Sequence, residues 1–515
     1  MQNSDYAVTR ESKAVPESKL RKYFISLSIL FATAVLSTAC DAPENTAAAP
    51  IYILPGVILV KAGESFQSAL NRAAAGDTIV LEDGATFRGP FVLPKKSGDK
   101  FVTIRSSSDR LPADETRLDP EKYGAHLPKL ISATAEPVIS TANGAHHYRF
   151  VGIEFGGTKD GAGNIIQIGT GSEVEAGELP HHIELDRVYI HATSPLGQRR
   201  GIAANGRHIK IANSYISNIV RAGDESQAIA AWATDGPIAI INNYLEAAAE
   251  NILFGGASSI LKLVPTDCIV ERNTLNKPDE WRGKNWVVKN LFEIKNGRRI
   301  KVRNNVMTNN WTMGQDGTAI LFSTRADNGP ATIIEDIEFT DNIVRNSDNG
   351  INVYGAEGSG GHRLTIRNNI FDRIGNPDVD GSGRFMKSTA WDGLVIENNT
   401  IINTGNITSA YGGPVVGFVF RQNIVFENEY GFIGDSKSPG SSTLDRYFPN
   451  SFVTGNVIIG GKPDRYRSKN FYPSSVEEVG FIGLSSGDLS LRPDSLYSSL
   501  SQSGKQFGAT ISSSR

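Results

Sequence analysis

Cysteine, methionine and long helical patterns are scarce in this chain of 515 residues. With only two cysteines, Cys40 and Cys268, no disulfide framework holds the fold together, and the strand-like sequence around Cys268 predicts a buried thiol rather than a nucleophile. Four methionines stand against 52 glycines, a composition that favours many short strands joined by tight turns. A formal net charge of −3, without a cluster of basic and aromatic residues, excludes a nucleic-acid partner.

The first forty residues have the pattern of an export signal. Three basic residues, at positions 19, 21 and 22, precede an apolar run over 24–39 that is too short to cross a membrane comfortably. The run ends at Cys40 in a sequence that resembles a bacterial lipoprotein cleavage site, although Ser37 stands where that site has an aliphatic residue. Ordinary cleavage after Ala39, or within 47–49, is the alternative.

These features predict where the protein is found and how the chain is divided. We expect residues 1–40 to form the signal peptide, 41–55 a linker and 56–511 the folded domain. The protein is then exported to the periplasm, the outer cell surface or the medium. Membrane contact is expected only through a lipid on Cys40.

A short block of β-branched residues, asparagine and further apolar residues recurs along the chain. Its copies lie at 211–216, 240–245, 270–275, 302–307, 339–344, 366–371, 396–401, 420–425 and 453–458, with an earlier copy carrying Asp at 185–190. The copies are about 30 residues apart, a period typical of a solenoid. We therefore expect an all-β, single-stranded right-handed parallel β-helix of about ten coils, with the Asn-marked coils starting by about residue 130 and ending near 460.

Asparagine suits the turn of such a coil for two reasons. Its backbone tolerates the left-handed conformation and its side chain can cap the turn. Stacked coils place one asparagine above the next, so their amides can form a ladder. The apolar residues on either side then alternate inward and close a continuous core.

Both ends of the domain carry further patterns. Ser65 is suited to cap a short helix whose apolar face includes Phe66, Ala69 and Leu70. This segment resembles the capping helix of the pectate-lyase-like β-helix superfamily, and 487–495 with Gly508-Ala509 resembles its closing segment. The resemblance covers residues 56–511 and implies the fold, but the superfamily holds lyases, hydrolases, epimerases and proteins without known chemistry.

The charged stretch 289–296 is the candidate functional strand. Alternation along a strand predicts that Asn290, Phe292 and Ile294 face the core. The outward set is then Lys289, Leu291, Glu293 and Lys295.

The segments around this strand supply further candidates. Register between neighbouring coils places Glu250 and Arg325 near the ends of the adjacent strands, and Arg298 and Arg299 follow at the next turn. Gly255 and Gly256 are expected to leave open space beside Glu293 and Lys295, as a ligand groove requires.

The sequence Glu293-Ile294-Lys295-Asn296 is similar to the lysine region of the chondroitinase B and alginate-lyase family. The resemblance implies β-elimination on a uronate polymer, which needs a base, an acid and a cation that neutralises the carboxylate. It implies Lys295 as the base and Arg325 as its partner, with Glu293 in the site. The expected substrate-binding residues are Lys289, Arg298, Arg299 and Glu250.

The family's two glutamate calcium ligands have no counterpart within 286–290. We therefore expect no metal ligands and no cofactor, with Ca²⁺ left open. The expected partner is a polysaccharide or other glycan, bound by a monomer.

Other interpretations of the same residues stay open. Lys289, Glu293 and Lys295 could form a plain surface salt-bridge ladder. The protein could be a non-catalytic β-helix that binds glycans or belongs to the cell surface. It could also be a glycoside hydrolase or epimerase that uses Glu250, Glu293 or Asp267, although the paired-aspartate and Asn-Thr-Asp motifs of polygalacturonase-type hydrolases are absent.

Three weaker features complete the candidates. The pairs His146-His147 and His181-His182 could bind a metal, but neighbours on a strand face opposite ways, which favours structural roles. Residues 378–381 resemble a calcium loop without its downstream glutamate, so a plain turn is expected. Some of the five tryptophans could be sugar platforms, and at least half are expected to pack in the core or loops: Trp232, Trp281, Trp286, Trp311 and Trp391.

Overall fold

The structure, a computed structural model, describes residues 56–375, 382–499 and 506–512. All of them fall in one compact unit. The expected signal segment with Cys40, the linker 41–55 and the turn at 378–381 lie outside the described residues. Within the described ranges, no helix is both long enough and apolar enough to span a bilayer.

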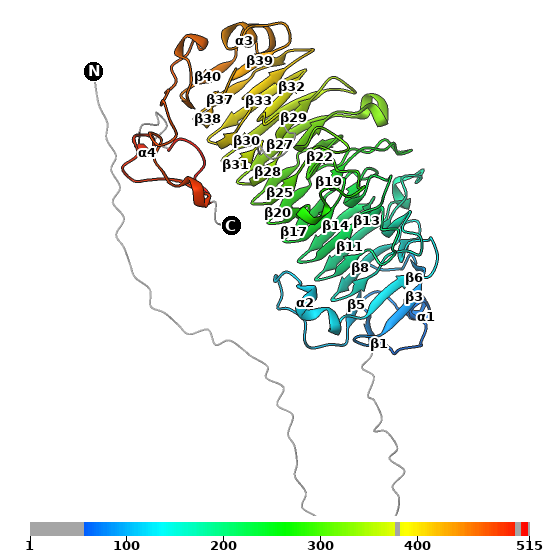
Figure 1. The fold of residues 1–515 in the computed structure, drawn as a ribbon. Helices are drawn as coiled ribbons and strands as arrows, with labels where there is room; N and C mark the ends of the chain where they lie inside the picture. Colours follow the sequence, from blue (N-terminus) through cyan, green and yellow to red (C-terminus); the bar gives the residue numbers. More distant parts are fainter. Residues whose placement is uncertain (1–55, 376–381, 500–505, 513–515) are drawn as a thin grey trace, which may run out of the picture. The chain divides into compact units, whose positions relative to one another are not determined.

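The chain winds through three long parallel sheets, contributing a strand to each in turn before returning to the first (Figure 1). Strands β8, β9 and β10, for example, belong to sheets A, B and C, and β11, β12 and β13 pair with them one coil further on. The apolar core lies inside the three sheets. The predicted fold, an all-β parallel β-helix, is confirmed.

Sheet A pairs its strands in the order β1 (Val57–Val60), β2 (Thr78–Leu81), β5 (Val102–Ser106), β8 (His146–Val151), β11 (His181–Asp186), β14 (Arg207–Ala212), β17 (Ile238–Ile241), β20 (Ile269–Glu271), β24 (Lys301–Arg303), β27 (Ile334–Thr340), β30 (Gly361–Arg367), β33 (Trp391–Glu397), β37 (Val419–Arg421) and β40 (Phe452–Thr454). Two short strands pair at its side, β23 (Gly297–Arg298) with β27 and β36 (Val415–Val416) with β33.

Sheet B contains β3 (Thr86–Gly89), β6 (Lys129–Ser132), β9 (Glu154–Phe155), β12 (Tyr189–His191), β15 (Tyr215–Ile219), β18 (Tyr244–Ala247), β21 (Thr274–Asn276), β25 (Val306–Asn310), β28 (Ile343–Ser347), β31 (Ile370–Ile374), β34 (Thr400–Asn403), β38 (Ile424–Phe426) and β41 (Val457–Ile459). Sheet C contains β4 (Phe91–Leu93), β7 (Ile139–Thr141), β10 (Asn164–Ile168), β13 (Arg200–Ala204), β16 (Gln227–Ala231), β19 (Glu250–Phe254), β22 (Phe292–Ile294), β26 (Thr318–Ser323), β29 (Asn349–Tyr354), β32 (Met386–Thr389), β35 (Thr408–Ala410) and β39 (Phe432–Gly434).

The remaining elements are short. The α-helices are α1 (Phe66–Arg72), α2 (Pro120–Tyr123), α3 (Ser441–Tyr447) and α4 (Leu496–Ser499). The 3₁₀ turns are Gly124–His126, Ala176–Glu178, Asp279–Trp281, Ala326–Ala331, Pro463–Arg465 and Leu484–Ser486. An antiparallel hairpin of β42 (Phe481–Gly483) and β43 (Asp488–Leu491) lies near the C-terminus.

The β-helix is longer than the sequence suggested. Sheet B has thirteen strands in the described part of the chain, against about ten expected coils. Sheet A begins at β1, before the Asn-marked coils, because the first coils lack the asparagine that marks the later ones. The predicted helix cap is confirmed: the side chain of Ser65 accepts a hydrogen bond from the backbone N–H of Ser68, and Phe66 packs against Phe91.

The two roles assigned to one asparagine fall on adjacent residues. From Asn243 to Asn456, the residue before each ladder asparagine is left-handed, as at Arg272 with φ 56°. The next residue forms the ladder: Asn273 donates from Nδ2 to Oδ1 of Asn305 at 3.0 Å, and Asn305 donates to Asn342 at 2.9 Å. The ladder is made of Asn243, Asn273, Asn305, Asn342, Asn369, Asn399, Asn423, Asn456 and Asn470. It therefore extends past the expected end near residue 460.

Candidate functional site

Four charged residues meet on sheet C, where β19 and β22 run side by side. The strand residues on either side of Glu293 point into the apolar core, so Glu293 points away from it. Glu250 begins β19, and Lys289 and Lys295 lie just before and just after β22. We call these four residues the charged cluster. Sequence reasoning singled out all four.

The charged cluster is buried. The side chains of Glu250 and Glu293 are 0 % exposed, that of Lys289 is 7 % exposed and that of Lys295 is 15 % exposed. The interpretation of these residues as a surface salt-bridge ladder is therefore wrong. Alternation along a strand shows which way a side chain points, but it does not reveal whether loops from other coils cover it.

Leu291 differs from its expected outward position. It lies in the main core, fully buried, beside Phe292. Strand β22 includes only Phe292–Ile294, and Leu291 lies at a bend just before it. The period-two argument applies only within an extended segment, so it holds at Glu293 and fails at Leu291.

A fixed ion pair joins Lys289 to two carboxylates. Lys289 Nζ lies 2.8 Å from Oε1 of Glu250 and 3.1 Å from Oε1 of Glu225. Burial alone would lower the pKa of Lys289, but the neighbouring carboxylates, Glu250 foremost, raise it above its ordinary value. Burial opposes ionisation of Glu250 as well, yet Lys289 brings its pKa below the ordinary value. This pair is therefore charged on both sides at neutral pH.

Glu293 has the opposite protonation state. Burial, together with the negative charge of Glu250, raises the pKa of Glu293 to about 8. Its nearest cation is Lys295, whose Nζ lies 3.6 Å from Oε1. In the described part of the chain, neither of its oxygens accepts a hydrogen bond with ordinary geometry. Two neighbouring carboxyls held in different protonation states are the arrangement that acid–base chemistry uses.

A ladder of polar side chains leads to Glu250 from the preceding coils, and sequence reasoning missed it. Asn164, Arg200, Gln227 and Glu250 are register partners on β10, β13, β16 and β19. Arg200 donates to Oδ1 of Asn164 at 2.9 Å and to Oε1 of Gln227 at 3.0 Å, and Gln227 donates to Glu250 at 2.9 Å. The sequence does contain a pattern that could have revealed this ladder, because each of the four residues precedes a core isoleucine by two positions.

Lys277 is the second buried lysine near the charged cluster, and it too was missed. Its Nζ donates to the backbone oxygens of Ala247, Ala249 and Asn290 and to Oδ1 of Asn251, at 2.8–3.1 Å. Burial lowers the pKa of Lys277 to about 7. Because it binds Asn290, it anchors the loop that carries Lys289 to the body of the β-helix.

The glycines beside Lys295 do not leave open space. A Cβ at Gly256 would lie 3.1 Å from Cδ of Lys295, and one at Gly255 would lie 2.7 Å from the backbone N of Asn296. The expected vacancy is therefore filled by the Lys295 side chain and by the next coil's backbone. Both glycines have φ of 83°, so a side chain there would be strained as well as crowded.

Arg325 lies on the coil after Lys295, and its backbone N–H donates to the Lys295 carbonyl at 3.4 Å. Its side chain is 44 % exposed and pairs with Glu357 at 2.8 Å. The guanidinium also lies 4.8 Å from the ring centroid of Tyr354. Arg325 is thus near the charged cluster, with its charge directed to the neighbouring coil.

Arg298 and Arg299 lie on the sheet A side of the coil. Arg298 pairs with Glu335, and Arg299 pairs with Asp267 at 2.6 Å. Asp267 is itself 57 % exposed in this pair, and Arg299 lowers the pKa of its carboxyl. The structure does not bring these three residues together with the charged cluster.

Most of the tryptophans pack against other apolar groups, as predicted. Trp281 and Trp311 form a small apolar cluster with Val288, and Trp286 packs against it. Trp391 belongs to the main core. Trp232 belongs to neither cluster, and the guanidinium of Arg200 lies 5.0 Å from its ring centroid. Cys268 is also buried, and burial raises the pKa of its thiol to about 12, so it is not a nucleophile.

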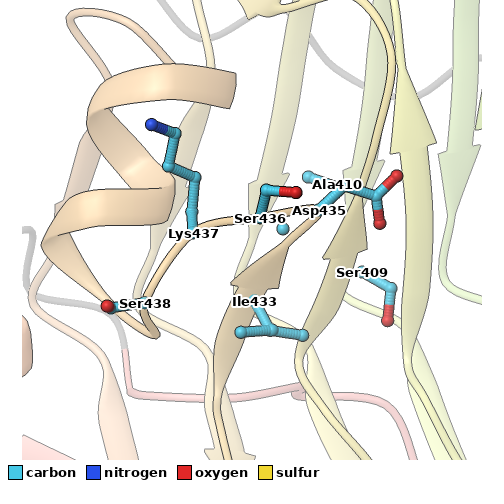
Figure 2. Close-up of a pocket in the computed structure, with 8 residues that line it drawn as sticks. Ser409, Ala410, Ile433, Asp435, Ser436, Lys437 and Ser438 are labelled. Atoms are coloured by element: carbon cyan, nitrogen blue, oxygen red, sulfur yellow. The ribbon is translucent and has the colours of Figure 1, made fainter.

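A separate hollow of about 600 Å³ lies at the last strands of sheet C, between β35, β39 and the segment leading to α3. Its polar lining includes Ser409, Asp435 and Lys437. Figure 2 shows Asp435 and Lys437 pointing in different directions. The hollow therefore does not gather an acid and a base as the charged cluster does.

The charged cluster does not fit a calcium ion. In the described residues, the one group of three Asp, Glu, His or Cys side chains with ligand atoms close together consists of histidines on β8 and β11. At the cluster itself, the ammonium of Lys289 lies where a cation would neutralise Glu250 and Glu225.

No family model and no curated protein matches the sequence. Similar solved structures include an alginate lyase from Paenibacillus, 16 % identical, covering 70 % of this chain and 95 % of that chain with a TM-score of 0.37. A family 6 alginate lyase is 15 % identical, with 81 % and 51 % covered and a TM-score of 0.46. A family 6 polysaccharide lyase from Pseudopedobacter saltans is 14 % identical, with 81 % and 92 % covered and a TM-score of 0.39.

Proposed function

We propose that this protein is an exported polysaccharide lyase that cleaves a uronate-containing polymer by β-elimination, with Lys295 as the base. The observation that carries the proposal is the pairing of Lys295, the most exposed member of the charged cluster, with a neutral Glu293 3.6 Å from its amine. Glu250 and Lys289 form the ion pair beside them.

The protonation of Glu293 matters because Lys295, as the proposed base, must first lose the proton of its ammonium form. An ionised carboxylate 3.6 Å from Lys295 would hold the ammonium form in place. Glu293 instead keeps its proton below about pH 8, owing to burial and to Glu250. Burial and the charge of Glu250 thus keep Glu293 neutral, so no ionised carboxylate at 3.6 Å holds Lys295 in an ion pair.

In the proposed step, the Lys295 amine takes the proton from C5 of the uronate. The C–H electron pair forms the double bond between C4 and C5, and the C4–O bond breaks. The departing oxygen takes a proton, from the Lys295 ammonium or from water, so that charge and atoms balance. Arg325, on the next coil, is the proposed cation for the substrate carboxylate, which would take the place of Glu357 in its ion pair.

The proposal is tested by incubating the purified protein with a panel of uronate polymers and monitoring the ultraviolet absorbance of the unsaturated product. Mass spectrometry of the fragments identifies the bond cleaved, because elimination leaves a product lighter by one water than hydrolysis does. An unsaturated product from at least one polymer supports the proposal. Hydrolysed fragments without a double bond would assign the Glu250–Glu293 pair to a hydrolase instead.

A second candidate function, glycan binding without cleavage, is favoured by one observation. The side chains of Glu250 and Glu293 are 0 % exposed, so neither carboxyl of the charged cluster is in contact with solvent. Binding of a polymer in a titration, with no change in its length or absorbance, would support this candidate and exclude the lyase.

A further inference from the structure

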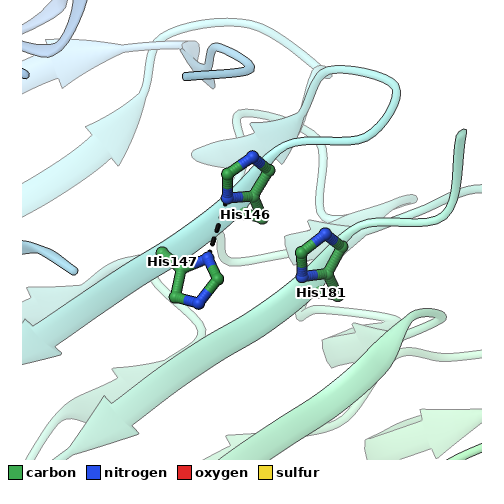
Figure 3. Close-up of side chains that lie close together, drawn as sticks. All are labelled: His146, His147 and His181. Atoms are coloured by element: carbon green, nitrogen blue, oxygen red, sulfur yellow. Dashed lines mark hydrogen bonds between the residues drawn. The ribbon is translucent and has the colours of Figure 1, made fainter. Parts of the chain in front are cut away.

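Five histidines gather on sheet A, apart from the charged cluster. They come from three successive strands: His146 and His147 from β8, His181 and His182 from β11, and His208 from β14. His146 and His181 are direct register partners. Figure 3 shows the rings of His146 and His147 meeting, with His181 on the adjacent strand.

Adjacent histidines were expected to face opposite ways, and this expectation is wrong. His147 and His182 have φ of 57° and 54°, in the left-handed region. This backbone turn at the start of each strand breaks the alternation and brings neighbouring rings to one side. The Nδ1 atoms of His146 and His147 lie 2.8 Å apart, and those of His181 and His182 lie 2.7 Å apart.

The two pairs also stack on each other. His146 lies over His181 with ring centroids 4.7 Å apart and an interplanar angle of 4°, and His147 lies over His182 at 4.4 Å and 8°. The ligand atoms of His146, His147 and His181 all lie within 4.8 Å of one another. Three imidazole nitrogens from two coils therefore face one small volume, and His182 adjoins them through its contact with His181.

The rings are suited to binding a cation rather than to carrying charge themselves. Burial, and then mutual repulsion, lowers the pKa of His181 to about 4, and it lowers those of His147 and His182. The nearby carboxylate of Glu184 is paired with Arg149 at 2.6 Å. Each Nδ1 pair shares one proton, which can move to Nε2 of the same ring and leave both Nδ1 atoms free to bind a cation.

We propose that His146, His147, His181 and His182 bind one divalent transition-metal ion of the zinc, nickel or copper class through Nδ1. Imidazole nitrogen is the ligand these ions prefer, whereas calcium and magnesium prefer oxygen. A zinc ion with bonds of about 2.0–2.1 Å places its nitrogen ligands about 3.3 Å apart. Each pair would open by about 0.5 Å and the two coils' rings would tilt together, with no net proton released.

Such an ion would tie two coils near the N-terminal end of the β-helix. It would act there as a structural clip, since the charged cluster lies on another sheet. Metal binding would then stabilise the folded chain without being required for turnover.

The test is calorimetric titration of the chelator-treated protein with Zn²⁺, with Ca²⁺ as the comparison ion. We expect one Zn²⁺ per chain, no Ca²⁺ bound at these residues and a higher melting temperature with Zn²⁺. The double variant His147→Asn/His182→Asn should lose more than about tenfold in Zn²⁺ affinity. Asparagine keeps the left-handed backbone, so this variant should still fold.

His362→Asn, which removes a histidine from another strand, is the matched control and should bind as the parent does. A second double variant, His146→Gln/His181→Gln, removes the other two ligands without touching the left-handed positions. Zn²⁺ binding that is equal in the parent and both double variants, or absent from the folded parent, would overturn the proposal.

Discussion

The Glu293 carboxyl and the Lys295 amine lie 3.6 Å apart, yet they do not form an ordinary ion pair at neutral pH. Burial and the charge of Glu250 raise the pKa of Glu293 to about 8, so its proton is retained. Glu250 takes the cation instead, through Lys289 at 2.8 Å. Which of two buried carboxyls is charged is thus decided by the position of one lysine.

The first prediction concerns the pH dependence of stability. The pKa of Glu293 rises from 4.5 to about 8 on folding, so between these values the folded chain binds more protons than the unfolded chain. Stability contributed by this group is therefore lost as pH rises through that window. In Glu293→Gln, unfolding midpoints in denaturant should fall less from pH 5 to pH 9 than in the parent.

The matched control is Glu338→Gln, at an exposed position on β27. It should show the parent's pH dependence. Equal pH dependence in Glu293→Gln and in the parent would mean that Glu293 is ionised in the folded chain.

The second prediction concerns the buried ion pair. Lys289→Met leaves Glu250 buried without its cation, which should lower the free energy of unfolding by about 3 kcal/mol or more. The double variant Lys289→Met/Glu250→Gln removes the stranded charge and should recover much of that loss. The measurement is equilibrium denaturation of the parent and the three variants, including Glu250→Gln. A loss below about 1 kcal/mol in Lys289→Met would contradict the burial of an intact pair.

The third prediction separates the two roles within one turn. Asn273→Ala removes a ladder amide and leaves its neighbours' hydrogen-bonding groups unpaired, which should cost about 1–3 kcal/mol. Arg272→Gly relieves a left-handed residue with φ 56° and should change stability by less than about 1 kcal/mol. Denaturant unfolding of both variants measures the difference. Equal losses at the two positions would show that the turn and the ladder are not separable.

The fourth prediction concerns localisation, which follows from residues 19–40 alone. If Cys40 carries a lipid, the protein expressed in a bacterial host fractionates with membranes, and Cys40→Ala moves it to the soluble exported fraction. Parent protein found soluble outside the cytoplasm would indicate ordinary cleavage near Ala39. Parent protein retained in the cytoplasm would contradict export.

Much of the fold was predictable because it rests on local rules that repeat. The asparagine-marked turns, the Ser65 cap and the buried Cys268 each depend on a few neighbouring residues, and each is found as expected. The repeat also multiplies the signal, since one turn in isolation would have been ambiguous.

The errors arise where backbone geometry departs from an ideal strand. Leu291 lies at a bend, and His147 is left-handed, so counting by twos failed at both. Neither departure has a local sequence mark such as glycine or proline. Sequence reasoning also assigned the left-handed turn and the amide ladder to one residue, whereas the ladder is formed by the residue that follows the left-handed one.

The environment of the charged cluster was also beyond sequence reasoning. Gln227 comes from the coil before Glu250, and Lys277 binds backbone oxygens of the preceding coil as well as that of Asn290, so these contacts depend on how the coils stack. Glu293 is likewise buried beside Glu250, which belongs to the preceding coil. The residue types could therefore identify the members of the charged cluster, but their protonation depends on burial and on neighbouring charges that only the folded structure shows.

The most direct test of the account is the initial rate of unsaturated-product formation by Lys295→Met beside that of Lys301→Met. Lys301 is exposed on β24 of sheet A, so its loss removes the same charge without touching the charged cluster. On a polymer that the parent cleaves, we predict that Lys295→Met loses nearly all activity while retaining the parent's melting temperature, and that Lys301→Met retains its rate. A folded Lys295→Met protein that cleaves at the parent's rate would contradict the central claim.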